Sequence, residues 1–148
     1  MHRYVAVAVA ALGLAACGAS EGIESLNLAF DSEVEAQTET MGTGSLARSP
    51  KEPDRTVIAR GTCILTGAGT ANQLLTLTLA LGTDKGSDTL TYVLPPTASI
   101  TVPFRLAATW SDVVASKQAI DVLISGSVST GSARCTGTVS SQPLTNYQ

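Results

Sequence analysis

The chain has 148 residues, of which six are aromatic, one is histidine and 14% are charged, so it has room for one modest domain with few catalytic side chains. Nine basic residues stand against twelve acidic ones, and the one run of like charge is acidic, which argues against nucleic acid as a partner. No apolar stretch reaches the roughly 20 residues of a membrane-spanning helix, so no transmembrane helix is expected.

The N-terminus has the layout of an export signal, a short basic start followed by an apolar run over residues 4–16. The run ends in Leu14-Ala15-Ala16-Cys17, which resembles the lipobox of bacterial lipoprotein precursors. The resemblance covers residues 1 to about 20. It implies that residues 1–16 are a signal peptide cleaved between Ala16 and Cys17, and that the Cys17 thiol is acylated. The alternative is an ordinary secretory signal in which Cys17 is incidental.

Two or three acyl chains on Cys17 would bury enough methylene groups for stable attachment, so a membrane is the expected partner through the lipid anchor. Gly18 follows the cysteine, whereas Asp at that place is the usual inner-membrane retention signal in enteric bacteria. The resemblance therefore implies the cell envelope as the location, and the outer membrane, facing the periplasm or the cell surface, in a host with two membranes.

Residues 17–55 differ in composition from the rest of the chain. Positions 18–55 hold eight acids and three bases, and residues 37–53 are rich in Thr, Gly, Ser and Pro, which predicts a flexible tether. A coil of about 35 residues would hold the domain on the order of 30 Å from the lipid. Deleting residues 36–52 is accordingly expected to leave the fold intact.

One part of this segment is more apolar. Ile23, Leu26, Phe30 and Val34 recur at spacings of three and four, as on one side of a short helix, and Leu26, Leu28 and Phe30 fit a strand equally well. Residues 23–34 are either a docking segment, for a partner or for the domain itself, or a weakly structured tether with a few apolar side chains.

From residue 56 the hydrophobic pattern has period two, which predicts strands with one buried face. The alternation covers residues 57–65, 75–81, 90–94, 100–110, 119–124 and 134–140, and Val128 could form a short strand of its own. Pro103 indicates an edge strand or a bulge. Residues 111–117 could be a loop or one helical turn.

Six or seven short strands without a convincing long helix predict an all-β fold, a small antiparallel β-sandwich in preference to a barrel, over residues 56–142. Residues 143–148 would be a C-terminal tail. The resemblance to the immunoglobulin-like class is architectural only, since no residue motif of that class is present.

Cys63 and Cys135 lie in the first and last predicted strands, each in phase with an apolar neighbour, Leu65 and Val139 respectively. Outside the cytoplasm such a pair predicts a disulfide, although two buried free thiols are the alternative. A metal site is not expected, because neither sulfur has a nearby His or Cys companion.

The mature chain is expected to have no catalytic residue, cofactor or metal ligand. Its one histidine, His2, leaves with the signal peptide, which removes Ser-His and Cys-His mechanisms and His-rich zinc sites. Asp84 and Asp88 flank Gly86 but lack the further ligands of a calcium loop, and a solvated hairpin turn is expected there. An enzyme is therefore the least favoured class of function.

Phe104 and Trp110 share a face with Ile100 and Leu106 and are expected to be core residues, although an aromatic binding platform of Tyr92, Phe104 and Trp110 is the alternative. Arg105 and Thr109, on the opposite face, are the better surface candidates. The favoured function is a noncatalytic structural or protein-interaction module, with a possible envelope protein partner. The alternative is a module that binds a small ligand, a glycan or an enzyme as its inhibitor. A cleft of polar groups on the Arg105 face would favour ligand binding, and a filled sandwich with a polar exterior would favour the structural or interaction role.

Overall fold

The computed structural model describes residues 25–66, 71–96 and 99–143. These residues form eight strands and no helix: β1 (Asn27–Val34), β2 (Glu39–Arg48), β3 (Arg55–Thr66), β4 (Gln73–Leu81), β5 (Gly86–Leu94), β6 (Ile100–Trp110), β7 (Gln118–Val128) and β8 (Ser132–Pro143). All neighbouring strands are antiparallel. The prediction of an all-β antiparallel sandwich is confirmed.

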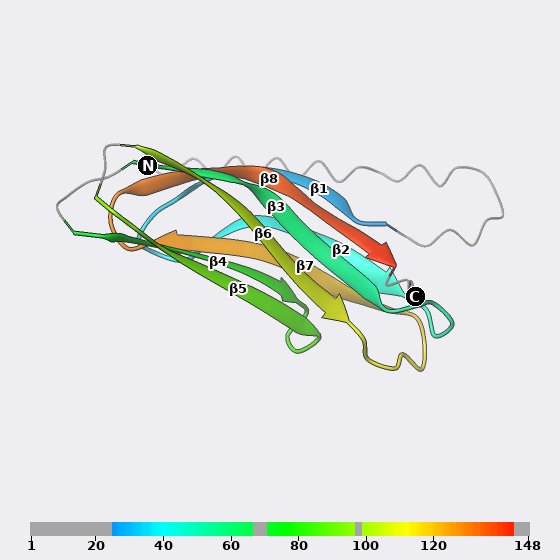
Figure 1. Ribbon diagram of the computed structural model, residues 1–148. Helices are drawn as coiled ribbons and strands as arrows, with labels where there is room; N and C mark the ends of the chain where they lie inside the picture. The colour runs from blue at the N-terminus through cyan, green and yellow to red at the C-terminus, as the bar shows by residue number, and fades with distance from the viewer. Residues whose placement is uncertain (1–24, 67–70, 97–98, 144–148) are drawn as a thin grey trace, which may run out of the picture.

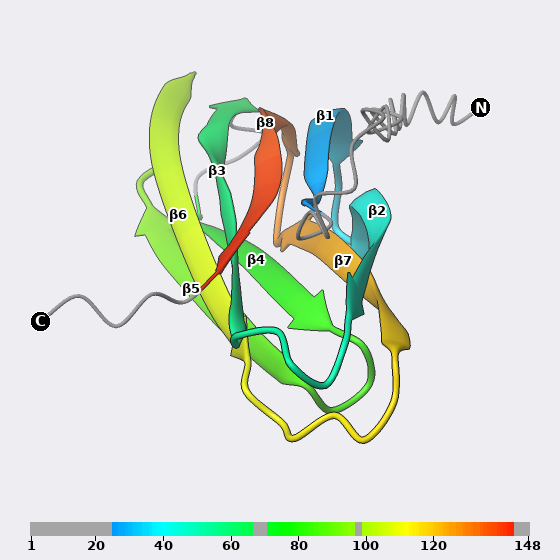
Figure 2. The same ribbon diagram turned by 90° about the vertical axis from the view of Figure 1, so that its right-hand side faces the viewer.

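The strands form two four-stranded sheets that pack face to face (Figures 1 and 2). The order is β1-β8-β3-β6 in the first sheet and β2-β7-β4-β5 in the second. Only β4 and β5 are consecutive in the chain and adjacent in a sheet; every other connection passes from one sheet to the other. This is the strand order of a jelly roll. It differs from the immunoglobulin order, in which several consecutive strands pair within a sheet.

The core lies between the sheets and is built by alternation along each strand. In β4 the four leucines at positions 75, 77, 79 and 81 are fully buried, whereas Thr76 and Thr78 point outward. Each other strand contributes inward side chains to the same continuous cluster except β5, whose Leu90, Tyr92 and Leu94 pack against its edge. Burial of one face of each sheet fixes the register, because a shift by one residue would turn every apolar side chain to solvent.

The predicted domain boundary at residue 56 is wrong, and so is the flexible tether where it covers residues 27–55. The sandwich begins at Asn27, and β1 and β2 occupy one edge strand of each sheet. Leu28, Phe30 and Val34 of β1 are buried, so the strand alternative for residues 23–34 holds for the part that forms β1. The helical stripe does not, and Ile23 lies outside the described residues.

The composition of β2 reflects tight packing rather than flexibility. Only Met41 and Leu46 are large apolar residues in this strand, and both are buried. A Cβ on Gly44 would lie 2.8 Å from Leu26 Cδ1, and one on Gly42 would lie 3.2 Å from Leu28 Cδ2. Leu26 and Leu28 therefore fill the space over these two glycines, and a larger residue at either position would require the leucine side chains to shift. The Gly and Thr content that suggests a linker belongs to a paired strand.

Three smaller predictions are settled by the strand boundaries. β7 runs without interruption through Val128, so a separate strand at that position is wrong. Residues 111–117 form a loop with bends and no helical turn, and Val114 is buried beneath it. Pro103 lies in β6, at the edge of the first sheet, which confirms the edge-strand prediction: an edge strand tolerates a residue without a backbone donor.

One row of four residues crosses the first sheet, with a phenylalanine on each outer strand and a glycine on each central strand; we call it the glycine row. Phe30 is opposite Gly137, which is opposite Gly61, which is opposite Phe104. The two phenyl rings stack over the glycines with centroids 6.1 Å apart and planes at 29°. The glycines at the centre of the row leave the space that the rings from the outer strands fill.

Cys63 and Cys135 are directly opposite on β3 and β8, with Cα atoms 4.1 Å apart, and form a disulfide across 72 residues of chain. Both are fully buried. The predicted bridge is confirmed, and it joins the two central strands of the first sheet, two positions from the glycine row.

Candidate interaction surface

The outer face of the first sheet carries two arginines side by side. Arg60 on β3 is directly opposite Arg105 on β6, and both side chains are exposed while their neighbours Ala59 and Leu106 are buried. Opposite residues of an antiparallel pair have Cβ atoms about 5 Å apart. The two guanidinium groups therefore project from nearly the same point of the sheet.

Neither arginine has an ion pair or a side-chain hydrogen bond with any of the described residues. Arg134 on β8 shows the contrast, because its Nε and Nη2 donate to the two carboxylate oxygens of Asp31 on β1 at 2.9 and 2.7 Å. The hydrogen bonds from Arg134 lower the pKa of Asp31 below its ordinary value. One arginine of the face is thus neutralised within the fold, and two are not.

Threonines surround this arginine pair. Thr138 is opposite Arg60 on its other side, and Thr62 and Thr136 form the adjacent row; all three are exposed. Thr109, the second predicted surface candidate, lies further along β6, where its Oγ1 is 3.0 Å from that of Thr56. Of the two predicted surface candidates, the side chain of Thr109 is therefore hydrogen-bonded within the described part of the fold, whereas that of Arg105 is not.

The outer face of the second sheet is different in character. Two threonines of β4 lie opposite two of β5, with Oγ1 atoms 3.4 Å apart for Thr76 and Thr91 and 3.2 Å apart for Thr78 and Thr89. Such Thr–Thr pairs stabilise neighbouring strands. These hydroxyls bond each other, so the pattern is explained by the sheet itself.

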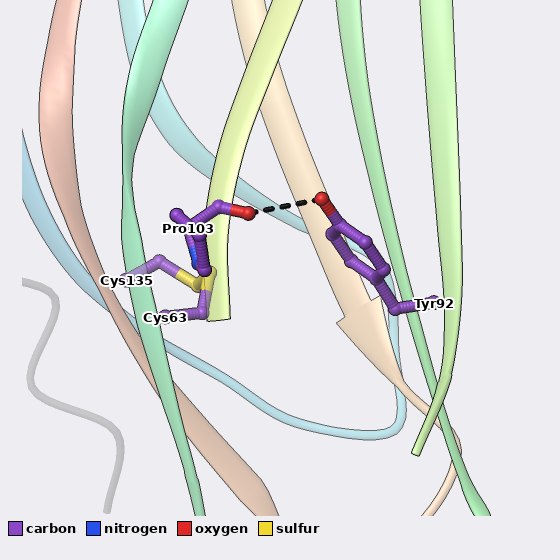
Figure 3. The surroundings of a disulfide bond; sticks show 4 residues. All are labelled: Cys63, Tyr92, Pro103 and Cys135. Carbon is purple, nitrogen blue, oxygen red and sulfur yellow. Dashed lines mark hydrogen bonds between the residues drawn. A yellow bond between two sulfur atoms is a disulfide. The ribbon is translucent and has the colours of Figure 1, made fainter. Parts of the chain in front are cut away.

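The open edge between β5 and β6 is closed by side chains of β5. Tyr92 Oη donates to the carbonyl oxygen of Pro103 at 2.9 Å (Figure 3), and Asp88 Oδ2 accepts from the backbone N–H of Ala107 at 3.0 Å. Both contacts use backbone groups on the free side of β6, which an added strand would otherwise pair with. The expected solvated turn fits residues 82–85, whereas Asp88 belongs to a strand.

A charged cluster closes one end of the sandwich. Arg48 is buried and donates to the carbonyl oxygens of Trp110 and Asp112 and to the carboxylate of Asp54. Its guanidinium carbon lies 5.6 Å from the centroid of the Trp110 ring. This cluster fastens the β2–β3 connection to the core and presents no exposed guanidinium.

The same connection is held at a second point. Arg55 is fully buried, and its Nη2 donates to Glu52 Oε2 at 3.1 Å. Burial opposes ionisation of Glu52, but hydrogen bonds from the Ser49 N–H and from Arg55 outweigh it, so the pKa of Glu52 lies below its ordinary value. The carboxylate is therefore a structural element of the 49–54 loop.

The predicted site residues have different outcomes. Ala16 and Cys17 lie outside the described residues, so cleavage and acylation stay predictions. Phe104 and Trp110 are core residues, as expected, with 5% and 0% of their surface exposed. Arg105 is exposed on the predicted face, and its neighbour Arg60 was missed because the sequence carries no signal for which residue of another strand lies opposite.

Within residues 25–66, 71–96 and 99–143, no three His, Cys, Asp or Glu side chains come together as they would around a metal ion. The same residues contain no helix long and apolar enough to cross a membrane.

Comparison with known proteins gives little. No family model matches the chain, and no curated protein matches it either. Among solved structures, the chain is similar to a chain in the structure of the infectious bursal disease virus Gx strain, with 11% sequence identity and a TM-score of 0.35. The match covers 80% of this chain and 39% of the viral chain. The assignment to the jelly-roll fold accordingly rests on the strand order.

Proposed function

We propose that this protein is a lipid-anchored component of the bacterial envelope, and that its jelly roll is a noncatalytic interaction module. The Leu14 to Cys17 segment supports the anchor by its resemblance to a lipobox. The buried bridge between Cys63 and Cys135 supports export, because structural disulfides persist mainly outside the reducing cytoplasm.

The proposed interaction role rests on one observation: apolar side chains fill the space between the sheets, and polar side chains lie on the outer faces. The space between the sheets is taken up by a continuous apolar cluster, so the groups available for recognition are on the two outer faces. A rigid double sheet with polar exteriors is suited to contacting a partner over a surface. This is the arrangement expected of a structural or interaction module rather than of a site within the sandwich.

The early start of β1 changes the expected distance to the membrane. With acylation at Cys17, nine residues, 18–26, would separate the lipid from the first strand. Nine residues extend at most about 30 Å. The predicted tether of about 35 residues would reach that distance on average and could extend much further. The module would therefore work close to its membrane.

Cell fractionation of the wild-type precursor and of Cys17→Ser tests this proposal. We expect the wild-type protein in the membrane fraction and the variant in the soluble or precursor pool, with the same disulfide in any exported material. Chemical crosslinking of intact cells should then capture a defined partner with the wild-type protein only. Equal membrane association of both proteins would contradict the anchor, and crosslinking that yields no reproducible partner would contradict the interaction role.

A further inference from the structure

We propose that Arg60 and Arg105 form a recognition site for an acidic polysaccharide on the outer face of the first sheet. This inference rests on the proposed interaction role and specifies its surface and ligand. The starting point is electrostatic, because like charges directly opposite on neighbouring strands destabilise a sheet. The fold does not neutralise this pair, although it neutralises Arg134 on the same face with Asp31.

The chemistry of the pair fits an anionic group that bridges the two side chains. Each guanidinium has five N–H donors in a planar fork that matches the oxygens of carboxylate, sulfate or phosphate. With Cβ atoms about 5 Å apart, both forks can reach one anion or two successive ones. Binding would convert the repulsion between the arginines into attraction to a shared ligand.

The support for the two arginines is rigid. β3 is a central strand with neighbours on both sides, β8 and β6, and three positions beyond Arg60 it carries Cys63 of the disulfide. The backbone of Ala107, two residues after Arg105, is held by Asp88. A site on fixed strands orders fewer groups on binding and so loses less entropy than a site on loops.

The acidic side chains near this face are either hydrogen-bonded within the fold or distant from Arg60 and Arg105, so they should oppose anion binding there only weakly. Asp31 is already paired with Arg134. Glu33 is in the row of Arg134 and Ile64, two strands and four residues away from Arg60. Strand spacing and rise place Glu33 roughly 16 Å from Arg60, beyond the screening length of about 8 Å at physiological salt. Asp88 of β5 makes no ion pair with either arginine, and its Oδ2 accepts from the backbone N–H of Ala107 at the edge of β6.

An extended sugar polymer fits this surface better than a nucleic acid. Nucleic-acid binders carry basic stripes, whereas this chain has a net charge of −3 and, in the part that the structure describes, a single pair of neighbouring arginines without an acidic partner. The exposed hydroxyls of Thr62, Thr136 and Thr138 next to the pair can exchange hydrogen bonds with sugar hydroxyls. An open sheet face also accommodates a long chain that passes across it.

The test uses the exported protein as it is isolated from cells, held in nanodiscs of phosphatidylcholine if it carries the lipid and in solution if it does not. Alginate and heparin are the carboxylate and sulfate probes, and dextran is the neutral control. We expect binding to at least one acidic probe and none to dextran. Loss of a charge-assisted hydrogen bond predicts about tenfold weaker binding for Arg60→Gln and for Arg105→Gln. Arg134→Gln, which removes the same charge from an ion pair, should weaken binding less than threefold.

Thermal unfolding separates this role from a structural one. Because the pair repels, each single Gln variant should keep or raise the melting temperature without ligand while it loses binding. Equal effects of Arg134→Gln and the two site variants, binding to dextran, or binding only to vesicles that contain phosphatidylglycerol would each overturn the proposal. These measurements are made on isolated protein, so a wrong cellular location would contradict the proposed envelope role without affecting this result.

Discussion

Replacement of Gly137, in the glycine row of the first sheet, with Ala should destabilise the protein, which is the opposite of what strand propensity alone predicts. Gly in a strand usually costs about 0.5–1 kcal/mol relative to Ala, so Gly137→Ala would stabilise an unconstrained strand. Here the added Cβ would overlap the backbone oxygen of Arg60 and would lie 2.8 Å from Phe30 Cζ, well inside the 3.5–4.0 Å of a normal carbon contact.

The magnitude follows from what has to move. The Phe30 ring must shift by about 1 Å out of its stack with Phe104, a strain of the size of core overpacking, about 1–3 kcal/mol. β8 must also draw away from β3, which weakens one or two ladder hydrogen bonds at about 1 kcal/mol each. We expect Gly137→Ala to lower the free energy of unfolding by about 3–4 kcal/mol, with a fall of roughly 10–20 °C in melting temperature.

Thermal and urea unfolding followed by circular dichroism measure this directly. The matched control is Thr138→Ala, at the next position of β8 but on the exposed face, which should change the stability by no more than about 0.5 kcal/mol. A Gly137→Ala protein that melts within about 3 °C of the wild type would refute the reasoning that close strand approach and ring packing require glycine.

Three further outcomes are expected. Deletion of residues 36–52 removes β2 with its buried Met41 and Leu46 and exposes the edge of β7, so it should abolish cooperative unfolding. Lys51→Ala in the same segment should unfold like the wild type, and a deletion variant that unfolds cooperatively with normal stability would restore the tether prediction. Replacing both Cys63 and Cys135 by Ala should cost about 4 kcal/mol, because a 72-residue loop is no longer closed in the unfolded chain, and urea titrations that coincide with those of the oxidised protein would contradict it. Because the pKa of Glu52 is lowered in the folded protein, its contribution to stability is complete above the unfolded value near 4.5 and is lost as the pH falls through the lower folded value. Glu52→Gln should therefore flatten the dependence of stability on pH below 4.5, whereas the control Asp121→Asn should not. The same pH dependence in both variants would argue against the Glu52–Arg55 link.

The strands with strong alternation could be predicted from the sequence because their burial is one-sided. β4 is the clearest case, since its leucines at every second position face the core and its threonines face solvent. The disulfide could be predicted for a related reason: both cysteines are in phase with buried neighbours in strands. These inferences need only the local pattern and the period of the pleat.

β2 could not be recognised because its information is in its neighbours. Its glycines lie under Leu28 of β1 and under Leu26, which precedes β1, so the local composition resembles a linker while the tertiary contacts make a strand. The strand order has the same origin. Six of the seven connections cross between sheets, and nothing in a single strand says which partner it will have.

The arginine pair shows where site prediction from sequence stops. Exposure of Arg105 follows from the alternation of β6, and exposure of Arg60 follows from that of β3. Their adjacency depends on the register between β3 and β6, which pairs two residues 45 positions apart in the chain and so requires the three-dimensional structure. The lipobox is the opposite case, because its signal is entirely local.

The central claim is that this jelly roll is attached to a membrane through Cys17 by a short connection, and mass spectrometry of the mature protein from the membrane fraction tests it most directly. The account predicts an N-terminal peptide that begins at Cys17 and carries the added mass of the acyl groups. An unmodified N-terminus at any other residue, recovered from soluble exported protein, would contradict it.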